Sequence, residues 1–377
     1  MVRFNVPPSV GNINSYINDV LEKNQKVSGD GIYTQRCSNW IQNKLDTPKA
    51  LLTTSCTHAL EMSAILAGIE PGDEIIAPSY TFVSSVNAFI LRGAKIVFVD
   101  IRPDTMNIDE NLIEDAITER TKAIIPVHYA GVSCEMTKIM EIARRYKLLV
   151  IEDAAQGVMA KYRGKPLGTI GDLGCFSFHD TKNYSMGEGG ALLIQDHQFI
   201  ERAEIIREKG TNRSNFIRGQ IDKYTWVDIG SSYLPSELNA AYLYAQLELA
   251  ETINENRLSA WNKYYSGLKP LMEAEILQLP FVPDECQQNA HMFYIKCADL
   301  DERTELMEYL RENNINTAFH YIPLHSSIAG RRFTRFHNED VFTTKESEKI
   351  LRLPIYYNIK DEDIEKVIDN IKSFYKG

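Results

Sequence analysis

The stretch Cys175-Phe176-Ser177-Phe178-His179-Asp180-Thr181-Lys182-Asn183-Tyr184 carries the most information in this chain of 377 residues. Its apolar first half is typical of a buried strand, which would deliver a hydroxyl, a histidine and a lysine to one turn. Gly187-Glu188-Gly189-Gly190 follows, and glycines allow the backbone to pass close to a neighbouring group. We therefore expect Ser177 and Lys182 to stand at a functional site, although an isolated lysine usually lies on an exposed loop.

A second apolar stretch, Val150-Ile151-Glu152-Asp153-Ala154-Ala155-Gln156, ends in a carboxylate. Successive side chains of a strand point to opposite faces, so Glu152 and Asp153 face in different directions. We favour Asp153 as the functional carboxylate. The structural alternative is that Asp153 caps a helix that begins at Ala154.

An amine and a carboxylate at the ends of neighbouring strands are what pyridoxal phosphate (PLP) requires. Lys182 would form a Schiff base with the aldehyde of PLP, and Asp153 would keep the pyridine nitrogen protonated so that the ring accepts electrons. An apolar pocket and a second cation nearby would lower the pKa of Lys182, which makes the amine a usable nucleophile and base.

Short apolar runs alternate with helical patterns, such as Cys134–Lys147, from about Lys49 to Leu193. This alternation predicts an α/β fold with a mostly parallel, doubly wound sheet. Ligands bind such sheets at the carboxyl ends of the strands, where Asp153 and Ser177 fall. The predicted strands are Ala50–Thr53, Glu74–Ala77, Lys95–Val99, Ala123–Val127, Leu148–Glu152, Gly174–Phe178 and Ala191–Ile194.

The pattern becomes helical after Leu234 and continues to about Leu268, where we expect Pro270 to break the helix. We place a domain boundary near residue 250. Residues 15–250 would form a large domain and residues 251–377 a smaller C-terminal α/β domain, with residues 1–14 packing on the smaller one.

The composition narrows the class of protein. The net charge is −10 and lysine and arginine are scattered, which disfavours nucleic-acid binding. The six cysteines lack zinc-ligand spacing and a disulfide-like framework, so we expect no metal site and a reducing compartment. We also find no signal-peptide core and no apolar run long enough to cross a membrane, and we expect a cytoplasmic protein.

The segment Thr53–Leu60 places small hydroxylated residues at the predicted start of a helix. Such residues commonly satisfy the free N–H groups of the first turn. The same N–H groups and the helix dipole also bind phosphate. Cys56 and Thr57 are our phosphate candidates, and Ser177 would add a hydroxyl from a neighbouring strand.

Aromatic residues follow other predicted strands. Tyr80 or Phe82 would lie on the cofactor ring, although an aromatic side chain at this place is more often part of the core. Further along, several polar aromatic residues form a candidate wall for the substrate. These are Tyr129, His320, Tyr321 and His325.

The runs Ile151–Gln156 and Phe176–Asn183 together resemble the nucleotide-sugar aminotransferases of the DegT/DnrJ/EryC1/StrS group. The resemblance covers nearly the whole chain and implies the PLP fold type I, the fold of aspartate aminotransferase. It extends over Pro78–Asp109, Val127–Met136, Arg207–Arg213, Tyr224–Tyr233, Gln288–Phe293 and Phe319–His325.

The resemblance assigns a role to each candidate residue. It implies that Lys182 is the Schiff-base lysine, that Asp153 is the partner of the pyridinium nitrogen and that Gln156 lies near the ring oxygen of the cofactor. It favours Phe82 over Tyr80 as the stacking residue. The positions that bind the cofactor phosphate are Cys56, Thr57 and Ser177.

The resemblance also implies a homodimer whose active sites are shared between subunits. In many relatives an asparagine from the partner subunit reaches the phosphate, and here Ser232 stands in its place within Asp228–Tyr233. Serine is shorter than asparagine, so the side chain at this position departs from the pattern of the family. A dehydratase branch of the family has histidine in place of the lysine, so Lys182 favours transamination.

The implied reaction takes the amino group of L-glutamate and transfers it, in a ping-pong sequence, to C4 of dTDP-4-keto-6-deoxyglucose. Another nucleotide-linked keto sugar, or the C4 epimer as product, is the first alternative. A nicotinamide or nucleoside triphosphate enzyme is disfavoured because neither a G-x-G-x-x-G turn nor a P-loop follows the first strand. A PLP-binding regulator is disfavoured because the acidic chain leaves no room for a basic DNA-binding module.

Overall fold

Eight strands form the central sheet of the structure, a computed structural model that describes residues 1–376. The strand order is β1-β9-β8-β5-β4-β2-β3-β12. The bounds are β1 (Lys49–Thr53), β2 (Glu74–Pro78), β3 (Lys95–Val99), β4 (Thr121–Ile124), β5 (Leu149–Asp153), β8 (Leu173–Ser177), β9 (Gly190–Ile194) and β12 (Thr334–Phe336).

The sheet is mostly parallel, as predicted. Only β9 runs antiparallel to its neighbours β1 and β8. Six of the seven predicted strands match the observed bounds to within one residue at each end. The exception is β4, which ends at Ile124 instead of Val127. Pro126 has no N–H to continue the ladder, and Val127 forms only a single bridge with Asp153.

Helices cover both faces of the sheet, because alternate side chains of each buried strand point to opposite sides. Ile76 and Val97 face a core that contains helices α2, α6 and α9, whereas Ile75 and Phe98 face a core that contains α3, α4 and α7. The helices are α2 (Ile32–Leu45), α3 (Cys56–Leu66), α4 (Ser84–Ile90), α6 (Met136–Tyr146), α7 (Ile200–Arg207) and α9 (Glu237–Leu247).

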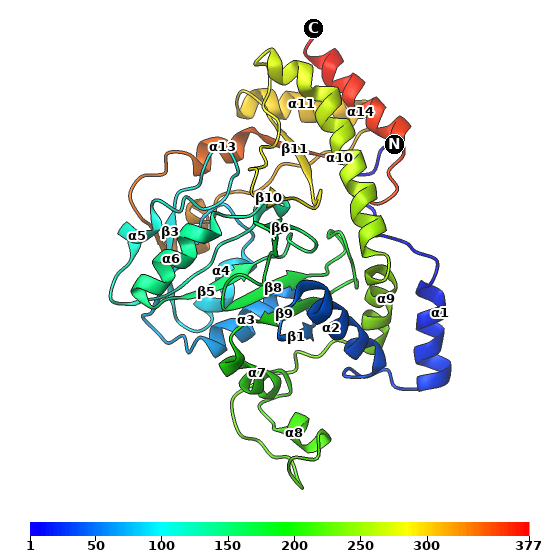
Figure 1. Cartoon of the computed structure of the whole chain (residues 1–377). Helices are drawn as coiled ribbons and strands as arrows, with labels where there is room; N and C mark the ends of the chain where they lie inside the picture. The colour runs from blue at the N-terminus through cyan, green and yellow to red at the C-terminus, as the bar shows by residue number, and fades with distance from the viewer. Residues whose placement is uncertain (377) are drawn as a thin grey trace.

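A smaller unit follows the long helix α10 (Ala250–Glu273), which runs from α9 towards α11 (Leu300–Glu312) and α14 (Asp361–Phe374) in Figure 1. It has its own hydrophobic core and a two-stranded antiparallel sheet. The strands of that sheet are β11 (Phe293–Lys296) and β13 (Ile350–Leu353).

The two units are interleaved at the sheet edge and at the N-terminus. Strand β12 comes from the C-terminal part of the chain but pairs in parallel with β3. Val2 lies in the core of the smaller unit, whereas Val10 and Ile13 lie in the core of the large one, so the first 14 residues contact both. A division near residue 250 stays a prediction.

Pro270 lies inside α10 and does not end it, contrary to expectation. The helix closes three residues later at Glu273, so the proline removes one N–H donor from the last turn without ending the helix. None of the helices in residues 1–376 has the length and apolar character needed to span a membrane.

The remaining elements are short connections between these units. They are α1 (Ile13–Asn18), η1 (Asp19–Asn24), α5 (Ile113–Ala116), η2 (Tyr129–Gly131), β6 (Lys161–Tyr162), β7 (Lys165–Pro166), η3 (His197–Phe199), α8 (Arg213–Ile217), β10 (Cys286–Gln287), η4 (Leu324–Ser326), α12 (Ile328–Phe333) and α13 (Thr343–Lys349).

Helix α2 begins at a glycine, which has no side chain to cap it, and a carboxylate from α9 supplies the cap. The buried Glu237 accepts hydrogen bonds from the N–H groups of Gly31 (3.0 Å), Tyr33 (2.8 Å) and Thr34 (3.0 Å). A negative charge at a helix N-terminus is also favoured by the helix dipole. This contact fixes α2 against α9 on the face of the sheet.

We predict that Glu237→Ala destabilises the fold by about 2–4 kcal/mol, because it leaves buried N–H groups without an acceptor. Urea unfolding followed by circular dichroism measures this as a lower midpoint. Glu251→Ala is the matched control, since Glu251 also contacts α2 through Lys44 but its side chain is 66% exposed. Equal midpoints for the two variants would contradict the capping role.

Candidate active site

A cavity of about 600 Å³ opens at the carboxyl ends of the parallel strands. Its walls come from the segments that follow β1, β2, β4, β5 and β8, and from the smaller unit. Both Lys182 and Asp153 line it. The other predicted residues that line it are Cys56, Thr57, Phe82, Gln156, Ser177, His320 and Tyr321.

Asp153 is buried and firmly held at the end of β5. Ser85 Oγ donates a hydrogen bond to one carboxylate oxygen (2.6 Å), and the backbone N–H of Ala155 donates to the other (3.1 Å). Ser85 is itself paired with Thr81 (2.6 Å). Hydrogen bonds to both oxygens fix the orientation of a carboxylate, so Asp153 presents a defined negative charge to the cavity.

Glu152, the competing carboxylate, lies on the opposite face of β5, as the strand alternation predicts. It is buried and accepts hydrogen bonds from the N–H groups of Gly168, Ile170 and Gly171 at 2.6–2.8 Å. His128 Nε2 lies 2.8 Å from the same carboxylate. Glu152 therefore fixes the loop of residues 168–171 and does not line the cavity.

Lys182 lies in the turn after β8, where its N–H donates to the carbonyl of His179 (2.9 Å). Burial lowers the pKa of its amine, and the positive charge of Arg352 lowers it further, although Cys56 and Asp153 act in the opposite direction. A lower pKa leaves more of the amine neutral near pH 7 to 8, and the neutral amine is the form that acts as a nucleophile or base.

Helix α3 points its N-terminus into the same cavity. Ser55 caps the helix by accepting from the N–H of His58 (3.1 Å), while the N–H groups of Cys56 and Thr57 have no acceptor among residues 1–376. Gly190 packs directly against this turn, and a Cβ there would lie 2.4 Å from the nitrogen of Cys56. Two free N–H groups at the start of an 11-residue helix suit an anionic oxygen.

Gln156, His320 and Tyr321 form another part of the cavity wall. Gln156 Oε1 accepts from the N–H of Ala130 (2.7 Å), and its Nε2 donates to the Tyr321 hydroxyl (3.4 Å). Burial raises the pKa of Tyr321 and lowers that of His320. Both side chains are therefore neutral hydrogen-bonding groups at pH 7. Phe82 stands at the cavity with 56% of its surface exposed.

Three other predicted residues lie outside the cavity. Tyr129 is buried behind His320, with its hydroxyl 3.2 Å from His320 Nδ1, so it supports the wall and does not face the space. The ring nitrogens of His325 contact the Ser79 hydroxyl (2.7 Å) and the Asp340 carboxylate (3.1 Å). Ser232 is exposed, beside Glu208, and does not line the cavity of its own chain.

Sequence reasoning missed Arg352, Ser85 and His291. Arg352 lies on β13 and lines the cavity, and its Nε is buried with no hydrogen-bond partner in residues 1–376. His291 Nδ1 lies 3.0 Å from Asn183 Oδ1, and burial lowers its pKa well below the ordinary value. A signal for Arg352 was available, because it is the one charged residue in the apolar strand Ile350–Leu353.

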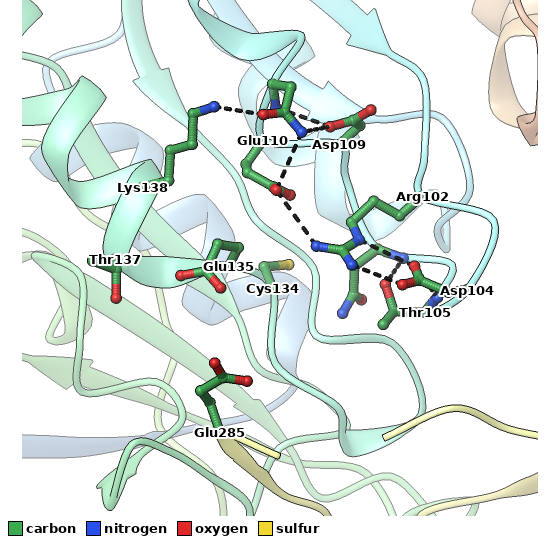
Figure 2. Close-up of polar contacts among 12 residues, drawn as sticks. Arg102, Asp104, Thr105, Asp109, Glu110, Cys134, Glu135, Thr137, Lys138 and Glu285 are labelled. Carbon is green, nitrogen blue, oxygen red and sulfur yellow. Dashed lines mark hydrogen bonds and ion pairs between the residues drawn. The ribbon is translucent and has the colours of Figure 1, made fainter. Parts of the chain in front are cut away.

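A second cavity of about 410 Å³ lies beside β6 and β10, and no lysine of residues 1–376 lines it. Figure 2 shows its arginine, Arg102, held between Asp104 (2.7 Å) and Glu110 (3.4 Å), so its charge is already neutralised. Glu135 and Glu285 complete an acidic wall. No group of three or more metal-ligand side chains occurs among residues 1–376. We therefore take the first cavity as the functional one.

The residues of the first cavity fit PLP. A fixed carboxylate, an amine of lowered pKa and two free helix N–H groups would serve the ring nitrogen, the aldehyde and the phosphate. An enzyme of the aminotransferase type is thus the class that this fold and cavity define.

Comparisons with known proteins agree. The family model of the DegT/DnrJ/EryC1/StrS aminotransferases matches residues 9–372, and the chain therefore belongs to this family. It is 35% identical to the uncharacterized protein MJ1066 of Methanocaldococcus jannaschii, over 91% of this chain and 90% of that protein. It is 32% identical to the spore coat polysaccharide biosynthesis protein SpsC of Bacillus subtilis, over 87% and 86% of the two chains.

The structure is also similar to that of the aminotransferase TlmJ from Streptoalloteichus hindustanus. The TM-score is 0.91 at 25% sequence identity, over 100% of this chain and 99% of that one. The predicted fold class, the PLP fold type I, is thus confirmed.

Proposed function

We propose that the protein transfers the amino group of L-glutamate to the C4 keto group of dTDP-4-keto-6-deoxy-D-glucose, using PLP. The products would be dTDP-4-amino-4,6-dideoxy-D-galactose and 2-oxoglutarate, for a cell-surface polysaccharide of the enterobacterial common antigen type. The observation that carries the proposal is that Lys182 and Asp153 line one cavity. Membership of an aminotransferase family supports the reaction class. The substrate is proposed from the sequence resemblance that includes Phe319–His325.

PLP, when bound, supplies an aldehyde carbon and a ring that accepts electrons. Asp153 would hold the ring nitrogen in its protonated form, and Phe82 would cover one face of the ring. Gln156 would donate its Nε2 hydrogen to the ring oxygen. The N–H groups of Cys56 and Thr57, with the Ser177 hydroxyl, would bind the phosphate.

Lys182 is the proposed proton carrier of both half-reactions. Its neutral amine removes the proton from Cα of glutamate, and its ammonium form later delivers a proton to C4 of the sugar. The side of C4 that faces Lys182 decides whether the new amine is axial or equatorial. The lowered pKa of Lys182 increases the fraction of neutral amine that can act as the base.

Arg352 is the proposed partner of a glutamate carboxylate. Its buried, unpaired Nε is costly to leave without an acceptor, and guanidinium groups bind carboxylates through two parallel hydrogen bonds. Repulsion between Arg352 and Lys182 falls when an anion binds. The neutral side chains His320 and Tyr321 would contact hydroxyl and keto oxygens of the sugar.

We further propose a homodimer that shares its active sites. A segment between residues 213 and 231, at the bottom of Figure 1, extends from α7 and exposes apolar side chains such as Trp226 (76%) and Ile217 (62%). These residues are costly to leave in water, and Phe82 is exposed at the cavity in the same way. Ser232, directly after this segment, would reach the phosphate of the partner's site.

Sedimentation equilibrium is expected to give a dimer, and Trp226→Asp is expected to weaken it at least tenfold, because a charge would enter an apolar contact. Phe333→Asp is the control, as Phe333 is also partly exposed but lies on α12. A wild-type monomer at micromolar concentration would contradict the shared site.

The alternative is another nucleotide-linked keto sugar, or the C4 epimer of the product, since no side chain of the cavity fixes either choice.

The six cysteines are free and buried, which supports a cytoplasmic location.

Product analysis by NMR tests the proposal directly. Incubation with PLP, L-glutamate and dTDP-4-keto-6-deoxyglucose is expected to give a C4 amine in the axial orientation of the galacto configuration. An unchanged sugar would refute the substrate, and an equatorial amine would refute the configuration. Keto sugars with a 3-keto group or a UDP carrier serve as the comparison panel.

Lys182→Ala is expected to retain PLP but to lose turnover by at least a thousandfold, because no other amine lines the cavity in residues 1–376. The absorbance of the enzyme-linked cofactor is expected to shift to that of the free aldehyde. His179→Ala, three residues earlier in the same turn, removes a side chain that bonds to Thr181 and so controls for loss of loop structure. Full turnover by Lys182→Ala would remove the central assignment.

A further inference from the structure

The N-terminal segment, residues 2–8, crosses one wall of the active-site cavity and is fixed on both sides of it. On one side Val2 is buried in the smaller unit, and its backbone bonds to Asn314 (2.8 Å) and Asn316 (3.1 Å). On the other side Asn5 Nδ2 donates to the carbonyl of Asp180 (3.0 Å), two residues before Lys182. Pro7 and Pro8 then stiffen the path towards the large unit.

Phe4 lies between these two attachments and lines the cavity. The centre of its ring is 4.9 Å from Cζ of Arg352. The face of an aromatic ring carries partial negative charge and attracts a guanidinium group. Such a contact restrains the plane of the guanidinium while leaving its N–H donors, which lie in that plane, free to bind an anion.

We infer that residues 2–8 are part of the amino-donor site, and that Phe4 is a positioning residue which sets the affinity of Arg352 for a dicarboxylate. The inference rests on the proposed function for the identity of the donor. It extends that function by assigning a binding role to a segment at the far end of the sequence from Arg352.

The segment links Arg352 of the smaller unit to the turn that carries Lys182. The bond from Asn5 to Asp180 fixes the segment beside that turn, and the hydrogen bonds of Val2 fix it beside the smaller unit. We infer that Phe4 therefore limits changes in the distance and orientation of the Arg352 guanidinium relative to the Lys182 amine. This matters because an amino acid must present its carboxylate and its Cα–H at the same time.

Binding of glutarate, a dicarboxylate without an amine, tests the inference without any reaction. We expect Phe4→Ala, in the full-length holoenzyme with any affinity tag at the C-terminus, to raise the dissociation constant of glutarate roughly five- to tenfold in calorimetry. Phe4→Leu, which keeps apolar bulk but has no aromatic face, is expected to behave like Phe4→Ala. Phe4→Tyr is expected to bind like wild type.

Phe333→Ala is the matched control, because Phe333 also lies 4.9 Å from an arginine (Arg332), but outside the cavity. It is expected to leave glutarate binding unchanged. In steady-state kinetics Phe4→Ala should raise KM for L-glutamate by a similar factor, with kcat and KM for the keto sugar changed less than about twofold.

Wild-type affinity for glutarate in Phe4→Ala, or in Phe4→Leu, would overturn the inference, as would absence of glutarate binding to the wild-type protein. A loss of affinity shared by Phe333→Ala would also overturn it, since the effect would then be general. Failure of the proposed function has a different signature: the wild-type protein would bind glutarate and leave the keto sugar unaminated.

Discussion

The parallel pairing of β5 with β8 is the constraint on which the site depends. Asp153 is in register with Cys175, so the carboxylate and the turn that carries Lys182 leave the sheet side by side at the same edge. The carboxyl ends of β1 and β2 meet them there and bring the start of α3 and Ser85 into the same space. Without this alignment the amine and the carboxylate would not border one cavity.

The cavity brings cationic groups together in a protein that is acidic as a whole. The chain carries a net charge of −10, yet Arg352 and the start of α3 present positive charge to about 600 Å³ of space, beside the carboxylates of Asp153 and Glu188. Burial, with the positive charges of Lys182 and Arg352, lowers the pKa values of His291 and His320, two of the histidines that line the cavity. The site therefore attracts carboxylates and phosphates locally, which is what a glutamate and a nucleotide sugar provide.

Patterns of neighbouring residues in the sequence predict most strands of the main sheet, and the site residues that directly follow those strands. Buried strands and the turns after them are adjacent in sequence, so Asp153, Ser177 and Lys182 could be found by reading along the chain. Arg352 and Phe4 could not, since their contact joins the two ends of the sequence and depends on packing of the smaller unit. Residue type alone predicts that Tyr129 and His325 line the substrate wall. In the structure, hydrogen bonds to neighbouring residues hold both side chains outside the cavity.

Strand β12 gives the chain an order of assembly. Thr334 pairs with Ile96, so the edge of the main sheet stays open until residue 334 has been synthesised. Until then β3 exposes unpaired backbone groups, which other chains can capture. A chain that ends before residue 334 leaves this edge uncovered, and we expect it to aggregate more readily than the full chain.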